Sequence, residues 1–179
     1  KINKPWISIF AGDHGVVEEN ISAYPQTVTR QMLQNFASGG AAISVIAKHH
    51  QAHLQVIDCG TVGDAYEYAG VERHCIRAGT ANFAKQAAMT EQECQAALQL
   101  GKNSVDLAKS KGADIFIAGE MGIGNTSAAA AIMAALTGLP VAECVGRGTG
   151  VDDAIFARKV ALISEALSLH QPDRHDPVG

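Results

Sequence analysis

The sequence has no C-x-x-C pair, no excess of basic residues and no long uncharged apolar run, and each of these shortages excludes a class of protein. Lys and Arg number 14 against 18 Asp and Glu, a formal net charge of -4 that supplies no basic patch for a nucleic-acid partner. The apolar part of the longest uncharged segment, around 128–141, is too short for a bilayer and includes Gly138 and Pro140, so no membrane partner is expected. The four scattered cysteines are typical of reduced thiols, which predicts a cytoplasmic protein.

What the chain does contain is enough apolar sequence for a globular core. Hydrophobic residues make up 47% of its 179 residues and charged residues 18%, which is typical of a folded domain and not of a disordered one. The chain opens on Lys1 and stops after "HQPDRHDPVG", so we expect a piece of a longer protein.

Apolar runs and helical patterns alternate along the sequence. Strands are predicted at 5–10, 54–60 and 114–119, with a weaker fourth at 141–146. Helices are predicted in 27–50 (two, meeting near Gly39 and Gly40), from the capping box of Thr90 and Glu93 onward, in the alanine-rich stretch after residue 125, and at 151–169. This order predicts an α/β fold with a parallel sheet flanked by helices, in which a ligand binds beyond the carboxyl ends of the strands.

The third strand runs into a glycine-rich turn that resembles a phosphate-binding loop. Read from Gly119, the spacing is G-x-x-x-x-G-N-T, with Asn125 where the usual pattern has lysine. Gly122 and Gly124 let the backbone approach an anion, and the helix that follows offers unpaired N–H groups, to which Asn125 and Thr126 add side-chain hydrogen bonds. The missing lysine favours a ligand with a single phosphate over a nucleoside triphosphate.

A second glycine cluster, G-R-G-T-G from Gly146 through Gly148, precedes the last helix. In that helix Lys159 lies on the same stripe as Ile155 and Leu162. One interpretation is a lysine whose stem covers the core while its amine reaches solvent. The other is that Lys159 points inward and supplies the positive charge that the first glycine turn lacks.

Glu120 is unexpected within an anion-binding turn, because a carboxylate repels phosphate. It either faces solvent near a helix N-terminus or faces a sugar hydroxyl, a water molecule or a developing cation. A carboxylate beside a sugar carbon suits group transfer through an oxocarbenium-like state.

Other polar residues leave alternatives open. His49, His50 and His53 could form a metal cluster, although imidazoles beside the free carbonyl groups of a helix end are commoner. Asp13 and His14 suit either acid–base chemistry or a turn. Without an acidic pair at a strand end, we expect no magnesium-bound pyrophosphorylated ribose, and we expect neither metal nor cofactor.

Four blocks together resemble the nicotinate-nucleotide–dimethylbenzimidazole phosphoribosyltransferase family: "GEMGIGNT", "GRGTGVDD…K", "RAGTANF…AMT" and "FAGDHGV…SAYPQ.VT.QM…GGAAI". They extend from Phe10 to Lys159 in the order of the family. The resemblance implies transfer of phosphoribose from nicotinate mononucleotide to 5,6-dimethylbenzimidazole, giving α-ribazole 5′-phosphate and nicotinate for the lower ligand of cobalamin. It also implies a Rossmann-like sheet, a smaller helical domain and a homodimer.

The same resemblance assigns roles to individual positions. Glu120 matches the family's glycine-turn glutamate, and the family's general base is a glutamate expected beyond Gly179. Residues 1–179 would thus be the core of the α/β domain, without the N-terminal segment and the C-terminal catalytic block, and nearly inactive alone. An alternative of another class is a nucleotide-binding module without catalysis. The phosphate and ribose contacts are Gly122, Asn125, Thr126, Gly148 and Lys159, and the base pocket is assigned to Tyr24, Gln26 and Gln34.

Overall fold

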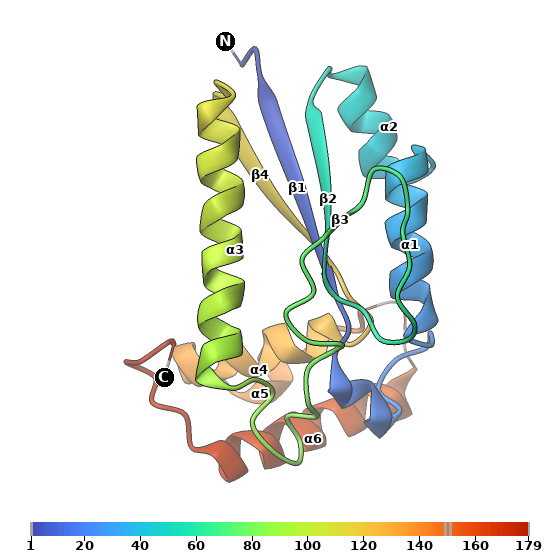
Figure 1. The fold of residues 1–179 in the computed structure, drawn as a ribbon. Coiled ribbons are helices and arrows are strands. Elements are labelled where there is room, and N and C mark those ends of the chain that lie inside the picture. Colours follow the sequence, from blue (N-terminus) through green and yellow to red (C-terminus); the bar gives the residue numbers. More distant parts are fainter. Residues whose placement is uncertain (1, 149, 151, 179) are drawn as a thin grey trace.

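The computed structural model describes residues 2–148, 150 and 152–178 and contains a four-stranded parallel sheet. The strands are β1 (Pro5–Gly12), β2 (His53–Gly60), β3 (Glu72–Arg73) and β4 (Ile115–Met121), in the order β3-β2-β1-β4 (Figure 1). In the central register, Ile7 of β1 lies opposite Leu54 of β2 and Ile117 of β4. The predicted α/β class with a parallel sheet is confirmed.

Helices flank both sides of this sheet, as Figure 1 shows. On one side lie α1 (Thr27–Ser38) and α2 (Ala42–His49), and on the other lies α3 (Glu91–Ser110), which opens with the predicted capping box of Thr90 and Glu93. The main core forms between the sheet and the first pair of helices, because alternate β1 residues point the same way. Its buried members are Ile7, Ile9, Ala11, Leu33, Phe36, Ala41, Ala47 and Val56.

Three further helices gather at the carboxyl ends of the strands (Figure 1). These are α4 (Asn125–Thr137), α5 (Val141–Cys144) and α6 (Asp153–His170), and a 3-10 helix, η1 (Gly15–Glu19), follows β1. Ala130, Val145 and Ile163 form the buried centre of a second, smaller core among them. The sheet therefore ends against a small helical layer, while the proposed division into domains stays a prediction.

Two elements differ from the sequence-based expectation. The predicted strand at 141–146 is wrong: this segment contains the helix α5, which follows Pro140 at its N-cap, a position where proline's missing N–H costs no helical hydrogen bond. The expectation missed β3, since Glu72 and Arg73 have neither apolar character nor alternation. Helix α6 starts two residues later than predicted, after the capping side chain of Asp152, and residue 151 lies outside the described residues.

Strand β4 is an edge of the sheet, and its apolar side chains are partly uncovered. Ile115 and Ile117 are 37% and 42% exposed, and with Ile7 and Ile46 they line a groove of about 310 Å³ beside α2. Among the helices of the described residues, none is both long and apolar enough to span a bilayer.

Candidate functional site

The loops that follow β1, β2 and β4 form one continuous rim. The Asp13 amide donates to the Gly60 carbonyl at 3.0 Å, and the Val62 amide donates to Asp13 Oδ2 at 2.8 Å. The Ile123 amide, in the turn after β4, donates to the Thr29 hydroxyl of α1 at 3.2 Å. The three glycine loops identified from sequence thus lie side by side and are held by hydrogen bonds.

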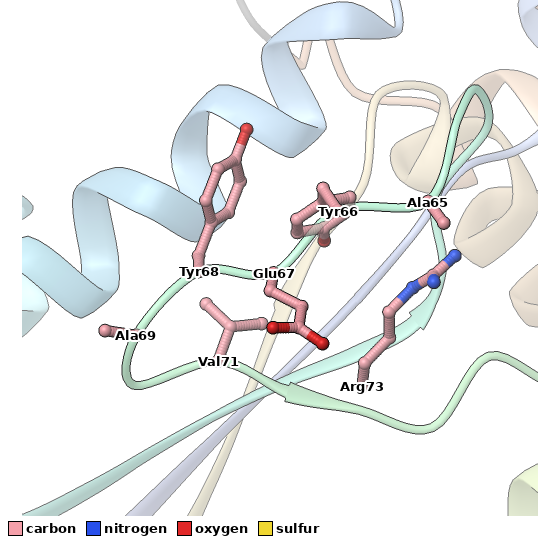
Figure 2. A pocket seen from close by; sticks show the side chains of 7 residues that line it. All are labelled: Ala65, Tyr66, Glu67, Tyr68, Ala69, Val71 and Arg73. Atoms are coloured by element: carbon pink, nitrogen blue, oxygen red, sulfur yellow. The ribbon is translucent and has the colours of Figure 1, made fainter.

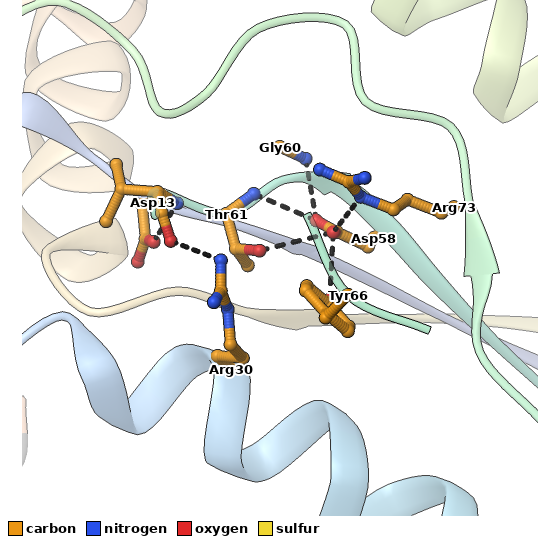
Figure 3. Close-up of polar contacts among 8 residues, drawn as sticks. Asp13, Arg30, Asp58, Gly60, Thr61, Tyr66 and Arg73 are labelled. Carbon is orange, nitrogen blue, oxygen red and sulfur yellow. Dashed lines mark hydrogen bonds and ion pairs between the residues drawn. The ribbon is translucent and has the colours of Figure 1, made fainter. Parts of the chain in front are cut away.

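Asp58, at the end of β2, anchors the loop that follows it (Figure 3). Its fully buried Oδ1 accepts the amides of Gly60 and Thr61, each at 2.9 Å. Its Oδ2 accepts the Tyr66 hydroxyl at 2.8 Å and the Thr61 hydroxyl at 3.2 Å, and lies 3.5 Å from Arg73 Nε. Every lone-pair direction of this carboxylate therefore has a donor, which explains why a buried charge is tolerated here.

The loop anchored by Asp58 encloses an open cavity of about 870 Å³ (Figure 2). The Tyr66 ring stacks under Arg30, whose Cζ is 4.5 Å from the ring centroid, and Arg73 lies near the same ring at 5.4 Å. None of the predicted site residues belongs to the lining, which consists of Ala65, Tyr66, Glu67, Tyr68, Ala69, Val71 and Arg73. This hollow is thus separate from the glycine turn.

The glycine turn after β4 is as tight as the sequence suggested. Gly124 takes a positive φ of 95° as the N-cap of α4, so the helix begins at Asn125, one residue earlier than expected. At Gly122 an added Cβ would lie only 2.4 Å from the Gly12 carbonyl oxygen, so no side chain fits there. The amides of Ile123 and Asn125 already donate within the protein, to Thr29 and Gly122. The amides of Gly124 and Thr126 are candidate donors for an anion.

Lys159 points inward and reaches this turn from α6. Its side chain is only 2% exposed, and Nζ donates to the Thr126 hydroxyl at 3.1 Å and to the Gly146 carbonyl at 3.2 Å. An added Cβ at Gly148 would lie 3.6 Å from Nζ, so the second glycine cluster also closes on the amine. Burial lowers the pKa of Lys159, and within the described part of the chain no carboxylate pairs with it. The solvent-reaching interpretation of this lysine is therefore wrong.

These groups surround a cavity of about 40 Å³. The sequence identified four of its lining residues as site residues, and it gave no signal for Ile21, Ser22 or Ile123, which contact the cavity only through the tertiary fold. The full lining is Ile21, Ser22, Gly122, Ile123, Gly124, Thr126, Arg147 and Lys159. The cavity has glycine backbone, hydroxyl groups and cations on its walls, a set of groups that suits a phosphate.

Glu120 and His14 converge at the edge of the turn. An added methyl group at Gly122 would lie 2.7 Å from Glu120 Oε1 and 2.9 Å from His14 Nε2, so both side chains face this glycine. Partial desolvation raises the pKa of Glu120 to about 7, and burial lowers the pKa of His14. At neutral pH the imidazole is therefore mostly uncharged, and the Glu120 carboxyl group is protonated in part of the molecules.

The three residues assigned to the base pocket are not brought to this cavity. Tyr24 is 50% exposed, and Gln34 lies on the exposed side of α1. Gln26 Nε2 donates to the His14 carbonyl at 3.0 Å, which holds the loop after β1. The base-binding role of these three residues stays a prediction.

Burial and contacts distinguish between the roles that the sequence left open for the other polar residues. Asp13 bridges loops, and burial raises its pKa. Burial, with the charge of Asp58 adding to it, raises the pKa of Cys59 to about 11, which leaves little thiolate to act as a nucleophile. Within the described residues no group of three potential ligands is placed to hold a metal, and His53 stacks on Trp6 with ring centroids 3.7 Å apart.

Comparisons with known proteins agree with one another. A family model described as Phosphoribosyltransferase (DBI_PRT) matches residues 1–179. A nicotinate-nucleotide–dimethylbenzimidazole phosphoribosyltransferase of Pseudomonas putida is 56% identical over 172 residues, covering 96% of this chain and 49% of the relative. Its counterpart from Pseudomonas aeruginosa is 51% identical over 176 residues, covering 98% and 50%.

A solved structure gives the same result. The crystal structure of CobT from Thermus thermophilus superposes with a TM-score of 0.90 at 45% identity, covering 96% of this chain and 52% of that one. The chain spans about half the length of the curated relatives it matches.

Proposed function

The chain belongs to the DBI_PRT phosphoribosyltransferase family, and from this premise we propose that it transfers phosphoribose from nicotinate mononucleotide to 5,6-dimethylbenzimidazole. The products would be α-ribazole 5′-phosphate and nicotinate. One observation supports this proposal above the others: Lys159 is a buried cation with no carboxylate partner in the described chain, and it faces a cavity walled by glycines. A buried charge without a counterion is costly, so a site of this kind favours an anionic ligand.

The phosphate of the nucleotide would occupy the 40 Å³ cavity. There the Lys159 amine and the amides of Gly124 and Thr126 would donate to its oxygens, at the N-terminus of α4 where the helix dipole adds to the attraction. Gly146 and Gly148 would pass close to the ligand without side chains, and Asn125 would donate from its side-chain amide. The lack of a lysine in the glycine turn is thus compensated by a lysine from another helix.

With the phosphate in this cavity, the ribose would extend toward Glu120. The bond between ribose C1 and the pyridine nitrogen breaks, and the electron pair leaves with nicotinate. The ribose ring then carries positive charge that a neighbouring carboxylate stabilises when ionised. A benzimidazole nitrogen forms the new bond to C1, and the proton on its other nitrogen must be lost to a base.

That base is predicted to lie beyond Gly179, and Tyr24, Gln26 and Gln34 are predicted to bind the benzimidazole. The homodimer that the resemblance implies and the cytoplasmic location that the scattered cysteines indicate also remain predictions. A nucleotide-binding module without catalysis is less well supported, because the matching relatives are named as transferases.

Replacing Lys159 with methionine tests the phosphate site, since the stem keeps its packing and only the charge is lost. A charge-assisted hydrogen bond contributes about 1.5–3 kcal/mol, so nicotinate mononucleotide should bind roughly 10- to 150-fold more weakly. Binding of 5,6-dimethylbenzimidazole should hardly change. Calorimetric titrations of both ligands, on the longest available protein, measure this.

The matched control is Lys48→Met, because Lys48 is an exposed lysine of α2. This variant should bind the nucleotide as the unmodified protein does. Equal nucleotide affinity in Lys159→Met and the unmodified protein would show that the phosphate lies elsewhere.

A further inference from the structure

Arg147 lines the same cavity as Lys159 but is engaged elsewhere. Its guanidinium donates to Asp153 Oδ1 at the start of α6, and Cζ lies 5.4 Å from the centroid of the Phe156 ring. The cavity thus contains two cations: Lys159, which is buried and without a counterion in the described chain, and Arg147, which is paired with a carboxylate.

The backbone that carries Arg147 is fixed relative to Lys159. The preceding carbonyl, that of Gly146, accepts from Lys159 Nζ at 3.2 Å. On the other side, Gly148 has a φ of 54° and an added Cβ there would lie 3.1 Å from the Thr126 hydroxyl. Only the side chain of Arg147 must rotate to bring the guanidinium to a ligand that Lys159 already contacts.

The pair with Asp153 is easily given up. The side chain of Arg147 is 56% exposed and that of Asp153 is 91% exposed, so water screens their attraction and hydrates the carboxylate once it is released. A phosphate offers more negative charge than a carboxylate and matches the planar fork of guanidinium donors. An anion held by Lys159 would therefore compete well for Arg147.

We propose that Arg147 is a second phosphate-binding cation, which Asp153 occupies until a phosphate monoester displaces it. This inference rests on the proposed function and extends it to the charge of the ligand. Near neutral pH a phosphate monoester carries about 1.5–2 negative charges, which two cations balance and one does not. The site thereby selects dianionic phosphate monoesters over nucleosides and over anions with one charge.

Titration of nicotinate mononucleotide into four proteins tests the inference: unmodified, Arg147→Met, Asp153→Asn and the double variant, each in the longest available chain. Arg147→Met should weaken binding about tenfold or more, because a charge-assisted contact is lost. Asp153→Asn should tighten binding by up to about fivefold, because the competing carboxylate is gone. In the Arg147→Met background, Asp153→Asn should have no effect, since no guanidinium remains to be released.

The control for long-range charge is Glu165→Gln, on the same helix about 18 Å along its axis from Asp153. It should leave nucleotide affinity unchanged. Circular dichroism shows that each variant is folded, and Arg147→Lys, which keeps the charge without the fork, should bind with intermediate affinity.

Three outcomes would overturn the inference: unchanged affinity in Arg147→Met, no gain in Asp153→Asn, or an equal gain from Asp153→Asn in both backgrounds. Failure of the proposed function looks different, because Lys159→Met would then also leave nucleotide affinity unchanged. If Lys159→Met weakens binding and Arg147→Met does not, the phosphate site stands and Arg147 has no part in it.

Discussion

Replacing Asp58 with asparagine should destabilise the protein markedly, although the two side chains have nearly the same shape. Asparagine can still turn its Oδ1 toward the amides of Gly60 and Thr61, and the hydroxyl of Tyr66 can rotate to accept from Nδ2. What changes is the charge, because the four hydrogen bonds of this side chain are then made by a neutral group. In addition, the Nδ2 amide of the asparagine would face Arg73 Nε, and both groups are hydrogen-bond donors.

The expected magnitude follows from these contacts. Hydrogen bonds to charged groups contribute about 1.5–3 kcal/mol and neutral ones about 0.5–1.5 kcal/mol, so each weakened bond loses roughly 1 kcal/mol. The asparagine no longer buries a charge, which offsets part of this loss. We expect the free energy of unfolding to fall by about 2–4 kcal/mol, within the range for breaking a buried network.

Equilibrium unfolding in guanidinium chloride, followed by circular dichroism, measures this difference. Asp64→Asn is the matched control, because Asp64 is exposed in the same loop, and its free energy of unfolding should change by at most ~0.5 kcal/mol. A second readout is Tyr66, whose pKa burial raises to about 12, with the hydrogen bond and charge of Asp58 adding to the effect. In Asp58→Asn this pKa should fall. If Asp58→Asn unfolds like Asp64→Asn, the network does not anchor the loop.

Two further predictions concern the glycine turn. Gly122→Ala should lower the free energy of unfolding by about 1–3 kcal/mol and abolish nucleotide binding, because its Cβ would lie 2.4 Å from a backbone oxygen. The control is Gly101→Ala, in the middle of α3, where an added Cβ has no atom within 4 Å. This control should raise the free energy of unfolding by about 0.5–1 kcal/mol in the same denaturant titration. Glu120 has a folded-state pKa raised to about 7, so the native state binds more protons than the unfolded state between about pH 4.5 and 7, and stability falls as pH rises through this window. Glu120→Gln should remove that slope from unfolding measured at several pH values, and an unchanged slope would assign the effect to another group.

Much of the fold could be predicted from local patterns. Apolar runs closed by glycine loops identified β1, β2 and β4, because buried parallel strands need both features. The inward direction of Lys159 was one of two readings of its stripe on α6. In contrast, β3 consists of Glu72 and Arg73, and its place in the sheet depends on the contact of Arg73 with Asp58 on the neighbouring strand. No local pattern encodes such a pairing.

The candidate site shows the same division. Glycines, Thr126 and Lys159 were predictable because a tight turn before a helix has a recognisable spacing. The hydroxyl of Thr29 that fixes the Ile123 amide, and Ser22 at the cavity wall, come from segments nearly a hundred residues away in sequence. Their contribution depends on how α1 and η1 fold back over the rim, which only the tertiary structure reveals.

The Lys159 amine has a consequence for the motions of the protein. It joins α6 to the start of α4 through the hydrogen bond to Thr126, and to the loop before α6 through the hydrogen bond to Gly146, which span 33 and 13 residues of sequence. A ligand held by both helices binds only while they are docked, so by thermodynamic linkage it opposes every local unfolding event that separates them. A ligand bound in the cavity of 40 Å³ should therefore slow amide hydrogen exchange along the whole of α6, relative to the protein without ligand.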